Sequence, residues 1–155
     1  MPNWCYNRIE VYADCDASDQ VNQLKEIHDI FADEKDPFNQ IFPIPDFKNI
    51  PNEKGELPVL EQHKGKDGEV MFETYNFPDG KNDDRWYHWC IANWGTKWEP
   101  DIADIEYADS EQLQLTFSTA WSPPEGIMQE LKDKYPDLGF TCFYDEPGCE
   151  IAGYY

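Results

Sequence analysis

The chain has 155 residues and a mass of 18.2 kDa, and its 32 acidic residues outnumber its 12 basic residues, which gives a formal net charge of −20 at pH 7. Hydrophobic residues make up 40% of the chain and aromatic residues 15%; this is enough apolar surface for a core and excludes a chain that is disordered throughout. A mean hydropathy of −0.78, with no apolar run near the roughly 20 residues that a bilayer requires, excludes a membrane-spanning helix.

The sequence also bears on the cellular compartment. Its first residues contain no cationic stretch followed by an apolar one, so we predict no signal peptide. The five cysteines are irregularly spaced and form no Cys-x-x-Cys pair, which is typical of a reduced protein rather than of a disulfide framework. We therefore expect a cytoplasmic protein without a membrane partner.

The acidic charge is concentrated towards the two ends of the chain. Residues 1–37 carry a net charge of −6, residues 38–98 carry −3, and residues 99–155 carry −11. A polyanion is bound mainly by Lys and Arg side chains that displace its counterions, so this balance predicts no direct binding of nucleic acid. The same field attracts basic protein surfaces. It also keeps a protein soluble, and charge alone does not separate these two roles.

The N-terminal part is predicted to form a strand followed by a helix. Residues 4–12 alternate, with Cys5, Ile9 and Val11 on one face and Trp4, Tyr6, Arg8, Glu10 and Tyr12 on the other. Apolar residues at helical spacing then predict a helix that ends near residue 32, with Ser18 or Asp19 as its N-cap.

The middle of the chain has weaker patterns. Residues 38–68 are rich in proline and lack a sustained period, which predicts irregular loop. A short strand is expected over residues 69–76. A Trp-rich helix is expected over residues 85–93, and Gly95 then takes the left-handed position that ends a helix.

The C-terminal part alternates more regularly. Residues 102–107 and 112–121 predict an antiparallel hairpin. Ser122-Pro123-Pro124 is typical of a helix start, with Ser122 as the cap. Residues 140–145 form the last predicted strand, and an aromatic tail follows over residues 148–155.

Without residues 38–98, the element order is strand, helix, strand, strand, helix, strand. This is the split βαβ order of an α+β ferredoxin-like sandwich. Right-handed crossovers place the first and third strands at the centre of the sheet and the second and fourth at its edges. We predict a single domain over residues 1–155, in which residues 1–37 and 99–155 form the ferredoxin-like frame. Residues 38–98 form a Trp-rich insertion between the first helix and the second strand.

Three motifs carry a family resemblance. They are Met1-Pro2-Asn3-Trp4-Cys5, Asn93-Trp94-Gly95-Thr96-Lys97-Trp98 and Thr119-Ala120-Trp121-Ser122-Pro123-Pro124. In this order they resemble the YubB-like ferredoxin-like proteins of phages and plasmids. The resemblance implies a ferredoxin-like fold and an origin on a mobile element. That family has no established activity, so the resemblance implies no catalytic residues. The motifs themselves indicate architecture, namely a helix end and a capped strand-to-helix corner.

Catalytic and cofactor motifs are not evident. His88 and Cys90 stand two residues apart on a predicted helix, so their side chains point in different directions, and Cys142 and Cys149 do not add a pair at zinc-finger spacing. The chain contains no Gly-rich phosphate loop, no nucleophile elbow and no cysteine spacing typical of an iron–sulfur cluster. We predict no catalytic residue, no metal and no cofactor.

The first candidate surface is an acidic rim formed by six carboxylates in thirteen residues, namely Glu99, Asp101, Asp104, Glu106, Asp109 and Glu111. If residues 102–107 form an edge strand, these charges guard that edge against aggregation. Alternatively, the rim imitates the phosphates of a nucleic acid and occupies a basic groove on another protein. Carboxylates on one face of a strand recur every ~6.6–7 Å, which is close to the spacing of phosphates along one strand.

The second candidate surface is the aromatic face of the first strand. Trp4, Tyr6 and Tyr12, with Phe140 or Tyr144 from the last strand, resemble the aromatic residues of RNA-recognition sheets, which stack on bases. Such sheets surround their aromatic residues with Lys and Arg, whereas the frame here has five basic residues against 22 acidic ones. We therefore expect these aromatic residues to form a second core.

These observations favour a non-enzymatic accessory protein of a phage or other mobile element. Its partner is expected to be a basic host protein that handles nucleic acid or serves in defence, bound in the host cytoplasm through the acidic rim. One alternative is a small enzyme with a site between frame and insertion, formed by Trp86, His88, Asn93, Lys97 and Trp121. Another is a structural or assembly protein. The sequence does not determine the oligomeric state.

Overall fold

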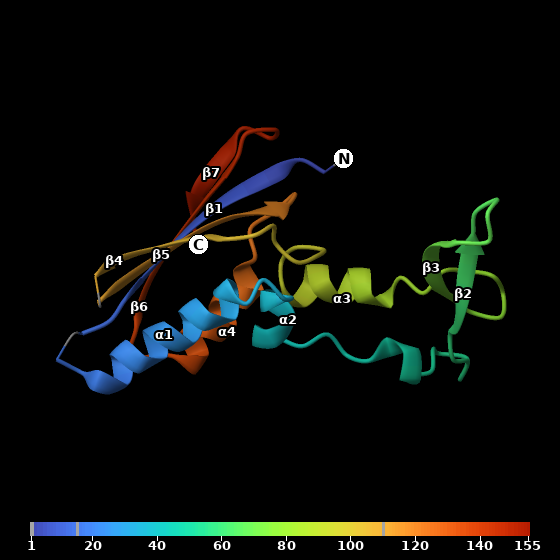
Figure 1. Cartoon of the computed structure of the whole chain (residues 1–155), viewed down its shortest axis with the longest axis horizontal. Helices are drawn as coiled ribbons and strands as arrows, with labels where there is room; N and C mark the ends of the chain where they lie inside the picture. Colours follow the sequence, from blue (N-terminus) through green and yellow to red (C-terminus); the bar gives the residue numbers. More distant parts are fainter. Residues whose placement is uncertain (1, 15, 110) are drawn as a thin grey trace. The chain divides into compact units, whose positions relative to one another are not determined.

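The chain folds into two compact units. The computed structural model describes residues 2–14, 16–109 and 111–155, and the side chains of these residues outside 107–109. The first unit comprises Met1–Pro43 and Cys90–Tyr155, and the second comprises Ile44–Trp89, the teal to yellow-green part of Figure 1. The second unit is therefore shorter at both ends than the predicted insertion. Phe38 and Trp94, which the prediction assigned to the insertion, pack edge to face in the core of the first unit, with ring centroids 5.7 Å apart.

A five-stranded antiparallel sheet forms the first unit. Its strands are β1 (Trp4–Tyr12), β4 (Asp104–Asp109), β5 (Gln112–Ala120), β6 (Gly139–Glu146) and β7 (Ile151–Tyr154), in the order β4-β5-β1-β6-β7. The central positions of the first and third frame strands, β1 and β5, are confirmed, as is the edge position of β4. The edge position predicted for β6 is wrong, because the turn after β6 returns the aromatic tail as β7 along its outer side.

Three helices lie on one side of this sheet in Figure 1. They are α1 (Ser18–Ala32), α2 (Pro37–Ile41) and α4 (Glu125–Lys134). The predicted extent of the first helix is confirmed. Neither predicted cap is present, because Ala17 is the N-cap of α1 and the hydroxyl of Ser122 instead donates a hydrogen bond to the carbonyl of Gly95.

The sheet has one covered face and one open face. Along β1 the side chains of Cys5, Asn7, Ile9 and Val11 are buried against the helices, and along β5 those of Leu113, Leu115, Phe117 and Thr119 are buried in the same way. The intervening side chains point to the opposite side. We call this side the open sheet face; its members are Trp4, Tyr6, Arg8, Glu10, Tyr12, Asp104, Glu106, Gln112, Gln114, Thr116, Ser118, Thr141, Phe143, Asp145 and Tyr154.

The three motifs of the family resemblance meet at one corner of the first unit. Gly95 has a positive φ of +89°, as expected for the residue that ends a helix. Three hydrogen bonds join the motifs: from the Thr96 hydroxyl to the Ala120 carbonyl, from the Ser122 hydroxyl to the Gly95 carbonyl, and from the Trp121 N–H to the Asn3 carbonyl. The motifs are therefore part of the architecture of this corner.

The second unit contains a hairpin and a short 3-10 turn. The hairpin consists of β2 (Val59–Lys64) and β3 (Val70–Asn76), and the turn, η1, is Phe47–Asn49. The predictions of β3 and of α3 (Arg85–Asn93), which runs from the second unit into the first, are confirmed. The prediction of irregular loop over residues 38–68 is wrong for β2 and for α2, because pairing with β3 and packing in the first-unit core order these weakly patterned segments.

Arg85 organises the polar interior of the second unit. Its guanidinium lies over the rings of Phe47 and Phe77, at 5.0 and 5.2 Å from their centroids. It also donates hydrogen bonds of 2.9 Å to both carboxylate oxygens of the buried Asp83. This pairing lowers the pKa of Asp83.

Across both units, no helix within the described ranges is long and apolar enough to cross a membrane.

Gly126 lies where the start of α4 approaches the end of α3. Its N–H donates a 3.0 Å hydrogen bond to the carbonyl of Trp94. A Cβ atom at this position would lie 1.6 Å from the carbonyl oxygen of Asn93, which is backbone and cannot rotate away. Only glycine therefore fits here without a shift of one helix.

We expect Gly126→Ala to lower the free energy of unfolding by more than about 2 kcal/mol, because the two helix ends must separate to admit the methyl group. Urea denaturation followed by circular dichroism measures this loss. Gly139→Ala is the control, since a Cβ there meets Tyr12 at an ordinary 3.5 Å, and its cost is expected to stay below about 1 kcal/mol. Equal stability of the two variants would contradict the close approach at Gly126.

Candidate functional site

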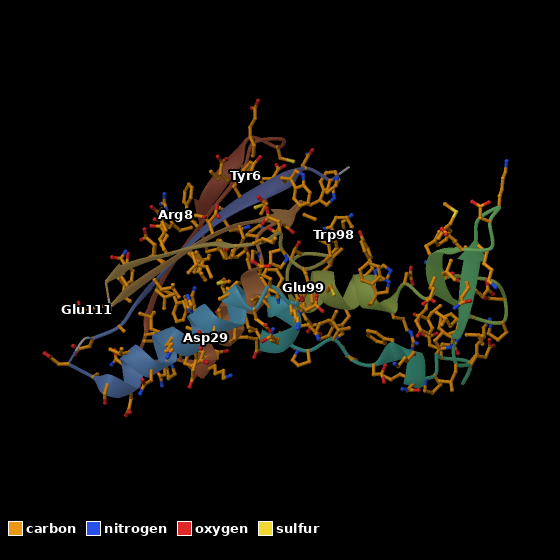
Figure 2. All side chains as sticks on the ribbon, in the orientation of Figure 1. Tyr6, Arg8, Asp29, Trp98, Glu99 and Glu111 are labelled. Atoms are coloured by element: carbon orange, nitrogen blue, oxygen red, sulfur yellow. The ribbon has the colours of Figure 1, made fainter. Side chains whose placement is uncertain are left out.

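The open sheet face carries exposed aromatic residues on its central strand. Trp4, Tyr6 and Tyr12 are 40%, 53% and 40% exposed, so the expectation that they form a second core is wrong. Figure 2 shows Tyr6 and Arg8 on the side of the sheet away from α1, which carries Asp29. The cause is the pleat of β1, which buries every second side chain against the helices and leaves the others without a packing layer from them.

The neighbouring aromatic residue on this face is Phe143, not Phe140 or Tyr144 as predicted. Phe143 stands opposite Arg8 in the β1–β6 register, whereas Phe140 stands opposite the buried Val11. A shift of one residue moves every side chain of a strand to the other face. The sequence pattern of β6 is aromatic on both faces and so did not determine which ones point outward.

Arg8 occupies the middle of the open sheet face. Its guanidinium carbon lies 5.1 Å from the centroid of the Phe143 ring, and its Nε atom lies 4.0 Å from a carboxylate oxygen of Glu10. The other oxygen of Glu10 accepts a 2.6 Å hydrogen bond from the Tyr12 hydroxyl, which raises the pKa of Tyr12. Arg8 is 47% exposed and is the one basic residue among the described residues of this face.

A hollow of about 330 Å³ opens beside Arg8. Its lining includes Tyr6, Arg8, Phe143, Asp101, Asp104 and Asp145. Asp101 precedes β4, and its carboxylate accepts a 2.6 Å hydrogen bond from the N–H of Ser118. The side-chain carboxylates of Asp104 and Asp145 have no hydrogen-bond or ion-pair partner within the part of the chain that the structure describes. The hollow therefore combines aromatic walls with two unpaired carboxylates.

The six residues of the predicted acidic rim do not form one surface. Asp104 and Glu106 lie on the open sheet face along the edge strand β4, and Asp101 lies just before it. Glu111 is exposed in the turn between β4 and β5, at the end of the hairpin in Figure 2. The side chain of Asp109 lies outside the described residues. Only part of the rim is therefore placed beside the hollow.

Glu99 has a structural role instead. Its two carboxylate oxygens accept hydrogen bonds of 2.8 and 2.7 Å from the backbone N–H groups of Phe38 and Asn39, at the start of α2 (Figure 2). Burial raises the pKa of Glu99 to about 7, although the two N–H donors oppose this shift. The carboxylate of Glu99 thus links its own segment to the start of α2, about 60 positions earlier in the chain.

The residues of the predicted enzyme site belong to different units. Trp86 and His88 lie in the second unit, where the His88 ring nitrogen is 3.3 Å from a carboxylate oxygen of Asp84. Asn93, Lys97 and Trp121 lie in the first. The Lys97 ammonium lies 4.0 Å from the ring centroid of Trp98, and Trp121 is exposed at the corner after β5.

The buried cysteines among the described residues lie in the first unit. Cys5 and Cys90 are buried, and burial raises the pKa of each thiol to about 11, so both are protonated near neutral pH. Across residues 2–14, 16–109 and 111–155, no group of three or more His, Cys, Asp or Glu side chains is arranged to hold a metal ion.

Comparisons with known proteins bear on the fold. Residues 93–155 match a family model described as the ferredoxin-like domain in Api92-like protein. The crystal structure of a protein api92 from Yersinia pseudotuberculosis matches with a TM-score of 0.61 and 12% sequence identity, over 99% of this chain and 93% of that chain. No curated protein matches the chain.

The predicted α+β ferredoxin-like fold is confirmed by these matches and by the strand order. At 12% identity the structural match shows the fold alone. The YubB-like resemblance and an origin on a phage or plasmid stay predictions.

Glu99 predicts a specific pH dependence of stability. Because its pKa rises from 4.5 in the unfolded chain to about 7 in the native state, the native state binds the proton more tightly between these values. Its stabilising contribution is therefore full below pH 4.5 and is lost as the pH rises through 7. We expect the wild type to lose stability relative to Glu99→Gln between pH 5 and pH 8, measured by urea unfolding at several pH values.

The control for this pH series is Asp137→Asn, which removes an exposed carboxylate and is expected to follow the wild-type profile. A constant difference between the wild type and Glu99→Gln across the series would show that Glu99 does not titrate in this range.

Proposed function

We propose that this chain is a non-enzymatic accessory protein that binds a basic partner protein through its open sheet face and the adjoining edge strand β4. The observation that carries the proposal is the composition of that face. Glu10, Asp104, Glu106 and Asp145 accompany one arginine, and exposed aromatic residues lie among them. Aromatic side chains bordered by charged groups are typical of protein-binding surfaces.

The overall charge supports the same partner. The first unit carries 22 acidic and 6 basic residues, a net charge of −16, whereas the second unit carries a net charge of −4. A field of this sign accelerates association with a positively charged surface and repels polyanions and anionic lipid.

The edge strand β4 supports binding to a protein that itself handles nucleic acid. Asp104 and Glu106 are successive side chains on one face of this strand, at the ~6.6–7 Å repeat that is close to phosphate spacing. Their charges also disfavour pairing of this edge with another copy of the same acidic strand. The charge along β4 is therefore complementary to a basic groove on a partner, whereas it repels the acidic β4 strand of a second copy of this chain.

The resemblance of the three corner motifs to YubB-like proteins supports an origin on a phage or plasmid. In that setting the partner is a host protein in the host cytoplasm, with nucleic-acid-handling and defence proteins as the class whose basic grooves fit this surface. The protein then acts by occupying such a groove, as a nucleic-acid mimic or inhibitor, and needs no reactive centre.

Neutralising the β4 carboxylates tests this function. We expect Asp104→Asn/Glu106→Gln to retain about tenfold less of the basic protein that the immobilised wild type captures from host lysate at 150 mM salt, because two charges facing the partner are lost. Quantitative mass spectrometry measures the captured amounts.

The matched control is Asp133→Asn/Asp137→Asn, which removes the same charge from exposed positions in α4 and just beyond it. This control is expected to stay within about twofold of the wild type. Equal losses in both variants would show that only net charge matters, and capture of no basic protein by the wild type would contradict the proposal.

The exposed aromatic residues favour single-stranded RNA as a second candidate ligand, which the surrounding charge opposes. We expect no binding of a labelled single-stranded RNA in filter retention at 150 mM salt, because carboxylates outnumber Arg8 on the same face. Tight binding that weakens steeply with salt would instead assign this face to RNA.

A further inference from the structure

The hollow beside Arg8 is a concave part of the open sheet face that is lined by both charged and aromatic side chains. It lies across β1, β5 and β6, with the segment that leads into β4 along one side. Its volume of about 330 Å³ exceeds that of one amino-acid side chain, so a group from a partner can enter it beside Arg8.

The carboxylates lie on opposite sides of Arg8. Asp104 pairs with Thr116, which pairs with Arg8, so Asp104 stands two strands away, or about 10 Å at the 4.7–4.9 Å strand spacing. Asp145 pairs with Tyr6 and is therefore a diagonal neighbour of Arg8, at ~7–8 Å. Neither carboxylate has a partner among the described residues, so each is available to a cation from outside.

The aromatic walls favour a planar cation. The ring of Phe143 already lies beneath the guanidinium of Arg8 at 5.1 Å, which shows that this surface accommodates such a group on an aromatic face. Tyr6 is 53% exposed and presents a second aromatic side chain in the same hollow. A guanidinium both stacks on a ring and donates paired hydrogen bonds to a carboxylate, whereas an ammonium offers a point charge.

We infer that the hollow is the binding site for an arginine side chain of the basic partner. Its guanidinium lies against Tyr6 beside Asp145, which stands opposite Tyr6 in the β1–β6 register, and Asp104 adds negative charge from the other side of the hollow. This inference rests on the proposed function and adds the residue by which the partner is recognised. Three carboxylates line the hollow against one guanidinium, so its net charge still favours a second cation despite the repulsion from Arg8.

The test uses three nine-residue peptides that differ only at three positions. These positions are all arginine in the first peptide, all lysine in the second and all citrulline in the third. Citrulline keeps the planar shape of arginine but has no charge. Binding to the isotope-labelled full chain at 150 mM salt is measured by amide chemical shifts, which give both the affinity and the location. We expect the arginine peptide to bind at least about fivefold more tightly than the lysine peptide. Its largest shifts are expected at Tyr6, Ser118 and Phe143, with no binding of the citrulline peptide.

Variants distinguish the hollow from the general charge. Asp104→Asn/Asp145→Asn is expected to weaken binding of the arginine peptide about tenfold, and the control Asp133→Asn/Asp137→Asn less than twofold. Arg8→Gln tests the sign of the ligand's charge. This variant is expected to bind the arginine peptide about threefold more tightly, because it removes a positive charge that repels the peptide's guanidinium. An anionic ligand would instead lose its partner in this variant.

The outcomes separate this inference from the proposed function. If the arginine and lysine peptides bind equally, or if the shifts lie away from the hollow, the arginine site is overturned while the acidic binding function stands. Equal weakening by the two double variants, or weaker binding by Arg8→Gln, overturns the arginine site in the same way. If neither cationic peptide binds, the proposed function fails together with the inference.

Discussion

One-sided burial of the sheet is the constraint on which the rest of the first unit depends. Buried and outward side chains alternate along β1 and along β5 up to Thr119, and α1, α2 and α4 cover the buried side. Because the buried side chains are fixed in this way, the strand register also fixes which side chains point outward, including those of Arg8 and Asp104. The residues of the open sheet face are therefore determined by the strand register. Its charges and rings are held at defined spacings because the opposite face cannot shift by one residue without exposing the core.

The corner formed by the three sequence motifs keeps this arrangement in place at one end. Gly95 and Gly126 allow the end of α3, the end of β5 and the start of α4 to approach within hydrogen-bond distance. The side-chain hydroxyl groups of Thr96 and Ser122, which belong to these motifs, donate hydrogen bonds to backbone carbonyls. Hydroxyl groups that are engaged in this way hold the corner together, which is the architectural role that the motifs indicate.

Much of the frame could be predicted from the sequence because its signals are local. The alternation of residues 4–12, the helical spacing up to Ala32 and the positive φ of Gly95 each act within a few residues. What could not be predicted depends on distant partners. β7 exists because a turn returns it to β6, and β2 exists because β3 pairs with it. The outward side of Phe143 follows from its register with β1, which a strand that is aromatic on both faces does not reveal.

The acidic rim shows the same limit within a single run of residues. Glu99 and Asp104 are five positions apart and belong to the same charged stretch, yet their environments are opposite. Glu99 is partly buried and accepts two backbone hydrogen bonds that hold α2, whereas Asp104 is exposed on the edge strand without a partner among the described residues. A count of carboxylates treats them as equivalent. Since only unpaired, outward carboxylates can attract a partner, the binding surface that we propose is smaller than the charged stretch, and the register of β4 against β5 decides which acids belong to it.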